Sequence, residues 1–249
     1  MRKFLRRASA LLVAVLAVAL PGSAGAGDLY GSTTLVMSAG QGKAGGSTAF
    51  FDNGGDDTDS SPAYGASFGY AVSVDELFPD RNLDAVADWR LRTELEGLYG
   101  RNYELRAQGA EPYLSQVDIW TLFWNTGLDV PLDRAISGLF GRIPVLEPLS
   151  FTLLAGVGLA GNEVSTTDNV SHGGLTSYDF AWQAGAGFGY ALTRHVTLGV
   201  AYRYFDPGSV DFPLRAGGNR IGNFELDLSA HEVATSIRVG FYSLPLPGR

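Results

Sequence analysis

The 249-residue sequence contains no cysteine. This absence excludes a disulfide framework, a zinc–thiolate site, a thiol nucleophile and a lipid-modified N-terminal cysteine. Charged residues are also few, at 18% of the chain, whereas 45% of the residues are hydrophobic, so intrinsic disorder is excluded. Stability must therefore come from packing, strand pairing or a membrane, and the length suits a single domain.

Basic residues are scarce and are not clustered along most of the chain. The sequence has 18 Lys and Arg against 26 Asp and Glu, which gives a formal net charge of −8. Four of the basic residues lie within the first seven positions, and Lys43 is the only lysine after them. The basic footprint of a nucleic-acid-binding protein is therefore missing, and no nucleic-acid partner is expected.

The first 26 residues have the pattern of a secretory signal peptide. A basic start is followed by an apolar run over residues 8–20 and by the small residues Ala24, Gly25 and Ala26. The run is too short for a membrane-spanning helix, which needs about 20 residues. We expect cleavage after Ala26, with Ala24 and Ala26 forming the small-residue cleavage site. An acidic, exported, cysteine-free chain of this kind indicates a bacterial envelope protein.

Long hydrophobic runs are absent after residue 26, which excludes a bundle of membrane-spanning helices. Instead, apolar residues alternate with polar or small ones in segments of about ten residues, the pattern of β-strands. Eight segments show it: residues 29–38, 64–73, 89–99, 117–128, 150–161, 180–190, 196–204 and 233–241. The even number of strands is compatible with a closed antiparallel barrel.

Alternation by itself does not distinguish a soluble β-sandwich from a membrane barrel. Two further features favour the barrel. Aromatic residues gather near the segment ends, as in the two girdles of a membrane barrel, and the opposite faces are rich in glycine, which suits a narrow lumen. We therefore predict an all-β, eight-stranded, antiparallel up-and-down transmembrane barrel over residues 27–242, with a short periplasmic tail over residues 243–249.

The polar faces of three segments predict a charged network inside this barrel. A lumen of eight strands is just wide enough for side chains, and buried charges need partners of opposite sign. The residues expected to point inward are Arg90, Arg92, Glu94, Glu96, Arg203, Glu232 and Arg238. The network is expected to centre on Arg92, Glu94, Glu96, Arg203 and Arg238.

The connections predict which end of the barrel faces outward. Four long, polar, Gly/Asn/Asp-rich stretches at residues 39–62, 102–116, 162–178 and 206–227 are expected to be extracellular loops. Residues 191–195 form a tight turn suited to the periplasmic side. The longer stretches 74–88 and 129–149 are expected to hold short helices, although ten strands remain an alternative.

The final segment changes phase. Phe224, Leu226, Leu228 and Ala230 are even-numbered, whereas the apolar residues from Val233 to Phe241 are odd-numbered. We expect a β-bulge near residues 230–232 to reconcile them.

The sequence resembles a known family at residues 153–160, 187–192, 196–204 and 231–241. These glycine- and aromatic-rich pieces are similar to the small eight-stranded outer-membrane β-barrel domains of the opacity-protein and surface-antigen types. The resemblance covers most of the chain after residue 26. It implies a bacterial outer-membrane location, with outer-membrane lipid and the barrel assembly machinery as partners. The assembly signal is expected at Ile237, Val239 and Phe241, although eight residues follow Phe241, whereas such barrels commonly end on an aromatic residue.

Enzyme and cofactor motifs occur only out of context. Residues 156–161 match G-x-G-x-x-G and residues 65–69 match G-x-S-x-G, but neither lies where a helix follows a strand in an α/β fold. The acidic stretch 52–59 does not have the spacing of an EF-hand loop. His231 with Ser229 is a candidate fragment of a catalytic triad, but a hydrogen-bonding role for His231 at the rim is favoured. No cofactor, metal ion or catalytic residue is expected.

Three functions are compatible with the predicted barrel. The favoured one is non-enzymatic: envelope structure, or surface interaction with an extracellular ligand or host surface through the long loops. The alternatives are a small pore for ions or a hydrophobic solute, and a barrel lipid hydrolase.

Overall fold

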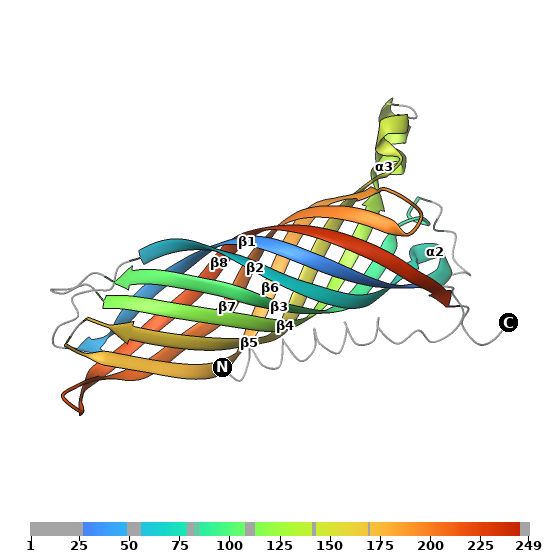
Figure 1. The fold of residues 1–249 in the computed structure, drawn as a ribbon. Helices are drawn as coiled ribbons and strands as arrows, with labels where there is room; N and C mark the ends of the chain where they lie inside the picture. Colours follow the sequence, from blue (N-terminus) through green and yellow to red (C-terminus); the bar gives the residue numbers. More distant parts are fainter. Residues whose placement is uncertain are drawn as a thin grey trace.

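The chain forms one closed barrel of eight antiparallel strands in sequential order, as predicted. The structure is a computed structural model that describes residues 27–48, 56–78, 83, 85–107, 113–140, 143–168 and 170–244. The strands are β1 (Gly27–Thr48), β2 (Asp56–Ser73), β3 (Arg90–Ala107), β4 (Tyr113–Pro131), β5 (Leu149–Thr167), β6 (His172–Ala191), β7 (Val196–Ala216) and β8 (Asn219–Leu244). Figure 1 shows the strands as a long, tilted cylinder. The expected cleavage site and residues 245–249 of the expected tail lie outside the described residues.

The two ends of the barrel differ. One end, here called the terminal end, holds the start of β1, the end of β8 and the helices α2 (Val74–Leu77) and α3 (Leu132–Phe140), with the 3₁₀-helix η1 (Pro144–Leu146). The expectation of short helices in both longer connections is therefore confirmed. Residues 192–195 form the tight turn between β6 and β7 at this end. No helix among the described residues is long and apolar enough to span a membrane. The opposite end is called the distal end.

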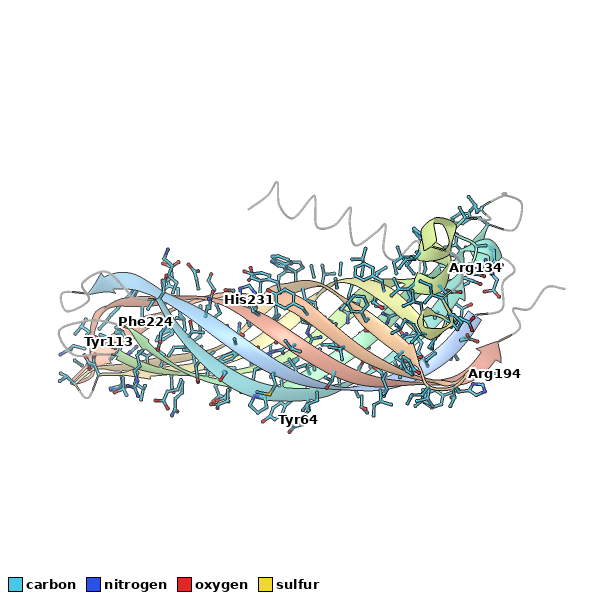
Figure 2. The ribbon with its side chains drawn as sticks, turned by 90° about the horizontal axis from the view of Figure 1, so that it is seen from above. Tyr64, Tyr113, Arg134, Arg194, Phe224 and His231 are labelled. Atoms are coloured by element: carbon cyan, nitrogen blue, oxygen red, sulfur yellow. The ribbon has the colours of Figure 1, made fainter. Side chains whose placement is uncertain are left out.

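A belt of apolar side chains surrounds the terminal half of the barrel. Its members include Leu35, Phe68, Leu95, Leu122, Leu153, Phe188, Val200 and Ile237, all exposed. Aromatic side chains line its distal edge, among them Tyr64, Tyr99, Trp120, Tyr178 and Tyr202. In Figure 2, Tyr64 and His231 lie between the terminal end, marked by Arg194, and the distal end, marked by Tyr113 and Phe224. An apolar belt with an aromatic edge is the surface that a β-barrel presents to lipid.

The strands continue well beyond this belt, so the prediction of four long loops is wrong. A strand needs about 9–11 residues to cross a bilayer, whereas these strands have 18 to 26 residues. Residues 39–48, 56–62, 102–107, 113–116, 162–167, 172–178, 206–216 and 219–227 of the expected loops are strands. The structure thus replaces most of each expected loop with a strand extension.

The extension has the opposite polarity to the belt. Its outward side chains are polar, among them Gln41, Lys43, Glu104, Gln116, Glu163, Asp211 and Asp227. Its inward side chains are mainly apolar, including Tyr103, Leu105, Val117, Phe212, Phe224 and Leu226, with a few buried polar ones such as Ser115 and Thr166. The polar outward residues contribute to the polar, Gly-, Asn- and Asp-rich composition that predicts loops for these stretches, although their backbone forms strands.

The bulge predicted near residues 230–232 is also wrong. The β1–β8 register is continuous from Tyr30–Gly240 to Thr48–Gly222. Even-numbered residues of β8 point inward both in the extension and in the belt. The apparent phase change arises because the apolar side chains move from the outer face to the inner face, whereas the backbone alternation does not change.

The extension consists of two four-stranded sheets that face each other. The β2–β3 ladder stops at Tyr64–Tyr99, and the β6–β7 ladder is interrupted between Trp182–Asp206 and His172–Arg215. The other six ladders continue into the extension. The sheets are therefore β7–β8–β1–β2 and β3–β4–β5–β6, and both contribute to one buried apolar cluster. The barrel thus passes into a β-sandwich with its own core.

Side chains of β2 close the first of these two seams. Ser61 Oγ, Asp59 Oδ2 and Asp57 Oδ2 accept hydrogen bonds from the backbone N–H groups of Asn102, Glu104 and Arg106, at 2.9, 2.8 and 2.6 Å. These three acceptors lie at every second residue of β2 and replace the carbonyl groups of a regular ladder. The donors of β3 are thereby satisfied although no backbone ladder forms there.

Two bulges at glycines determine which side chains point inward on the distal side of the belt. Gly100 in β3 has φ +101° and lies where the β3–β4 register shifts between Leu98 and Arg101. Before it, even-numbered residues of β3 face inward, and after it, odd-numbered ones do. Gly208 in β7, with φ +89°, lies at an equivalent shift. Positive φ is strained for residues other than glycine, so these positions favour glycine.

Candidate functional site

The interior of the barrel is the candidate site, and its centre holds four buried charges that form an open ring, in the order Arg101, Glu232, Arg203 and Glu96. Glu232 accepts from two arginines: Arg203 Nε lies 2.6 Å from Oε2, and Arg101 Nε lies 2.6 Å from Oε1. Arg203 also pairs with Glu96, with 3.3 Å between Nη1 and Oε2. These side chains are at most 4% exposed. Two positive and two negative charges leave the ring neutral.

Neutral side chains add hydrogen bonds to this central layer. Gln183 Nε2 and Asn125 Nδ2 donate to Glu96 Oε2 at 3.0 and 3.1 Å. Ser38 Oγ donates to Glu232 Oε1 at 2.9 Å. The guanidinium of Arg101 also lies 4.2 Å from the centre of the Phe205 ring. Buried ion pairs stabilise a protein only when such additional partners offset desolvation, and here they are present.

A second charged layer lies nearer the terminal end. Asp129 is the common partner of two arginines, with 2.8 Å to Arg92 Nε and 3.2 Å to Arg238 Nη1. Thr152 Oγ1 donates to the other oxygen of Asp129 at 2.6 Å. Tyr30 OH donates to Glu94 Oε2 at 2.8 Å, and Arg92 lies 3.4 Å from the same oxygen. These side chains extend across the lumen from strands β1, β3, β4, β5 and β8.

An apolar plug fills the lumen on the distal side of the central layer. Phe123 and Phe205 meet edge to face at 5.9 Å, and Phe212 and Phe224 lie 5.4 Å apart. Tyr113 packs on Phe224 at 6.0 Å. All five rings are at most 2% exposed. The plug therefore separates the charged interior from the distal end.

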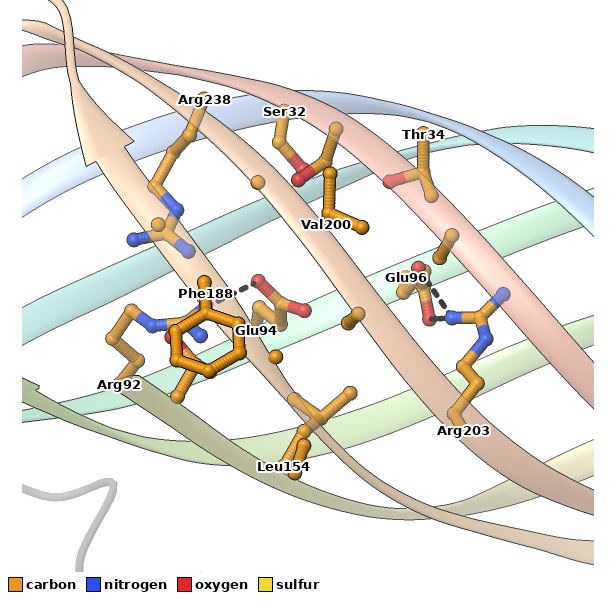
Figure 3. A pocket seen from close by; sticks show the side chains of 18 residues that line it. Ser32, Thr34, Arg92, Glu94, Glu96, Leu154, Phe188, Val200, Arg203 and Arg238 are labelled. Carbon is orange, nitrogen blue, oxygen red and sulfur yellow. Dashed lines mark hydrogen bonds and ion pairs between the residues drawn. The ribbon is translucent and has the colours of Figure 1, made fainter. Parts of the chain in front are cut away.

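A small cavity remains between the two charged layers. Figure 3 shows it between Arg92 and Arg238 on one side and Glu96 and Arg203 on the other. Its volume is about 80 Å³. Arg203 Nη2 is buried without a hydrogen-bond partner among the described residues, and Arg203 lines this cavity. The volume suits a few water molecules, whereas sites for drug-sized ligands measure about 300–1,000 Å³.

Six of the seven charged residues expected in the lumen lie inside the barrel, in two layers. Arg203, Glu96 and Glu232 meet in the central layer, whereas Arg92, Glu94 and Arg238 lie in the terminal layer. Arg90 lies instead at the terminal mouth, where it pairs with Asp28 and its side chain is 44% exposed. The first strand residue of β3 is simply too close to the barrel end to be enclosed.

Several residues of both layers were missed by sequence reasoning. Asp129, Asn125 and Gln183 are odd-numbered, like the other inward-facing residues of their strands, and could have been found from this alternation. Arg101 could not be found in this way, because the bulge at Gly100 changes the inward-facing residues of β3 from even-numbered to odd-numbered ones. The sequence contains no signal that Tyr30 faces inward, because it is a large aromatic residue next to the start of the first expected strand.

The expected assembly signal lies on β8 near the terminal end. Ile237 and Phe241 are exposed on the outer surface, at 49% and 60%. Val239 lies between them, half-buried and opposite Gly31 of β1. The segment is therefore accessible, and its role in assembly stays a prediction.

The other chemistry weighed from the sequence finds no assembled site. His231 is on the outer wall, where its Nδ1 lies 2.6 Å from Tyr202 OH, and Ser229 is not among its hydrogen-bond partners. Over the described ranges, no three His, Asp or Glu side chains are grouped so as to hold a metal ion. Gly156, Gly158 and Gly161 lie inside strand β5, with no helix after them.

Comparison with known proteins identifies the class of this barrel. The sequence model described as "Outer membrane protein beta-barrel domain" matches residues 10–233. The solved structure of Neisserial surface protein A is 16% identical, with a TM-score of 0.44, and the match covers 87% of this chain and 99% of that one. OprG from Pseudomonas aeruginosa is 12% identical, with a TM-score of 0.41, and the match covers 89% of this chain and 98% of OprG. Ail of Yersinia pestis is 11% identical, with a TM-score of 0.36, and the match covers 84% of this chain and 98% of Ail. The search of curated proteins found no match.

Proposed function

Because the chain belongs to the family of outer membrane β-barrel domains, we propose that it is a closed, non-conducting and non-enzymatic barrel of the bacterial outer membrane. Its role is to hold the distal β-sandwich outside the cell for envelope structure or surface interaction. In this orientation the terminal end faces the periplasm, since the short turns and termini of such barrels lie there. The expected loops are thus replaced by a rigid sandwich as the interacting surface.

One observation carries the proposal: the lumen is filled at three successive levels. The terminal charged layer, the central ring and the apolar plug each extend across the lumen. The two charged layers make ion pairs and hydrogen bonds within the protein, so their groups are held in place without a permeating ion. A steady water-filled path needs all three levels to open together.

Planar-bilayer recording tests the proposal. The folded protein, identified by a heat-dependent shift in mobility on SDS gels, should give no steady single-channel conductance, whereas a known general porin reconstituted in the same way should conduct. A steady conductance of the unmodified protein would support the pore alternative and overturn this proposal. The hydrolase alternative predicts release of fatty acid from phospholipid vesicles that is lost in a His231→Ala variant, whereas the proposal predicts no release by either protein.

A further inference from the structure

The outer wall of the sheet β7–β8–β1–β2 contains a groove just distal to the aromatic edge of the belt. Its volume is about 510 Å³, within the range of small-molecule sites. Residues from all four strands line it, including Gln41, Lys43, Thr58, Tyr204, Asp206, Ser209, Asp227 and Ser229. Small side chains and the bulge at Gly208 form part of its lining.

Five polar side chains that line the groove are not used by the fold, whereas Asp57 and Asp206 of the same lining accept backbone hydrogen bonds from Arg106 and Gly208. Gln41, Lys43, Ser209, Asp227 and Ser229 make no side-chain hydrogen bond or ion pair with any other described residue. In the strand register Gln41 lies opposite Ser229, and Lys43 lies opposite Asp227. The groove therefore offers an amide, hydroxyls, carboxylates and an ammonium side by side, which matches a ligand with many hydroxyl groups rather than an apolar one.

An aromatic wall borders the groove towards the membrane. Tyr204 lies between Trp182 and His231, with ring centres at 5.3 and 5.4 Å. His231 is itself held by Tyr202, through the 2.6 Å contact between Nδ1 and OH. Packing thus restrains Tyr204 as a fixed platform. Sugar rings combine an apolar C–H face, which packs on such rings, with hydroxyl edges that need hydrogen bonds.

The charge of the groove narrows the class of sugar. Among the lining residues, one cation, Lys43, faces four carboxylates, those of Asp56, Asp57, Asp206 and Asp227. A sulfated or phosphorylated glycan would meet like charge here, whereas a neutral or amino sugar would not. We propose that this groove binds an oligosaccharide of neutral or amino sugars, with Tyr204 as the stacking platform and Gln41 and Asp227 as hydrogen-bonding residues.

This inference deepens the proposed role in surface interaction and depends on it. Two sources can present this chemistry: the sugars of outer-leaflet glycolipid, which lie at the level of the aromatic edge, and a free or foreign glycan. The protein in phosphatidylcholine nanodiscs is titrated by calorimetry with panels of neutral, amino, sulfated and sialylated oligosaccharides. In a second arm, lipopolysaccharide whose outer polysaccharide consists of neutral sugars is incorporated into the nanodiscs, and its retention by the protein is measured.

A variant pair makes the test specific. Gln41→Ala/Asp227→Ala alters the groove, whereas Gln116→Ala/Glu163→Ala makes the same chemical change on the exposed outer face of β4 and β5. Binding of a neutral or amino glycan should weaken about tenfold or more in the first variant and less than about twofold in the second. Binding of the free glycans identifies a soluble source, and binding of lipopolysaccharide alone identifies the glycolipid.

The inference is overturned if no oligosaccharide of the panels binds and lipopolysaccharide does not bind either. It is also overturned if sulfated or sialylated glycans bind best, or if both variants lose binding equally. None of these results bears on bilayer conductance, so the failure of this inference and the failure of the proposed function are distinguishable.

Discussion

Arg203 and Glu232 lie directly opposite each other in the β7–β8 ladder, and their side chains meet inside the barrel with 2.6 Å between Nε and Oε2. The same carboxylate binds Arg101 through its other oxygen. Glu232 thus pairs with both arginines that are buried at the centre of the lumen. The remaining charge of the ring, Glu96, reaches only Arg203 among these arginines, so the ring depends most on Glu232.

Glu232→Gln should destabilise the barrel strongly, because Arg101 and Arg203 would lose their shared counter-ion. Removing one member of a buried ion pair costs about 3–5 kcal/mol. Urea unfolding of the protein in lipid vesicles, followed by tryptophan fluorescence, measures the change. Glu163→Gln, which alters an exposed carboxylate of the extension, serves as the control and should change the free energy of unfolding by less than about 0.5 kcal/mol. Equal stability of both variants would contradict the central role of Glu232.

Gly100→Ala should be destabilising, whereas Gly97→Ala in the same strand should be nearly neutral. Gly100 has φ +101°, a conformation that costs other residues about 1–3 kcal/mol. A methyl group at Gly97 meets no atom within 4 Å. Urea midpoints of the two variants make the comparison. Similar midpoints would show that the bulge that turns Arg101 inward does not require glycine.

Asp59→Ala and Asp57→Ala should loosen the seam between β2 and β3. Each substitution removes the acceptor of one backbone N–H, of Glu104 or Arg106 respectively. A hydrogen bond of this kind contributes about 0.5–1.5 kcal/mol. Amide hydrogen exchange at Glu104 and Arg106 should therefore become about 2- to 10-fold faster. Asp211→Ala, on the outer face of β7, should leave the exchange rates of the Glu104 and Arg106 amides unchanged. Faster exchange of these two amides in the control variant would argue against a local effect.

The connection between β5 and β6 should loosen in acid. Burial by itself raises the pKa of Asp168, but hydrogen bonds from the backbone N–H groups of Ser171 and Val170 hold that pKa below its usual value. A lowered pKa in the folded state means that the stabilisation is complete above the unfolded pKa and is lost as pH falls through the folded one. Exchange at the Ser171 amide, corrected for its intrinsic pH dependence, should therefore accelerate below about pH 4. In Asp168→Asn this acceleration should be absent.

Local patterns in the sequence are sufficient to predict the fold class of this protein. Period-two alternation between residues 89 and 99 put Arg92, Glu94 and Glu96 on one face and Leu95 and Tyr99 on the other, and the structure has the same division. Such local patterns suffice because a β-strand assigns alternate side chains to opposite faces whatever its partners are. The tight turn at residues 192–195 and the helix within 133–140 were likewise local signals.

Only the tertiary structure decided what each face meets. Phe224, Leu226 and Leu228 carry the same alternation as a lipid-facing strand, yet they point into the plug because the strands there have left the apolar belt and pair into two facing sheets. Arg101 likewise joins Glu232 only because one glycine bulge reverses the parity of β3. Alternation specifies that two faces differ, whereas the solvent on each side, whether lipid, water or another sheet, depends on contacts between residues far apart in the chain.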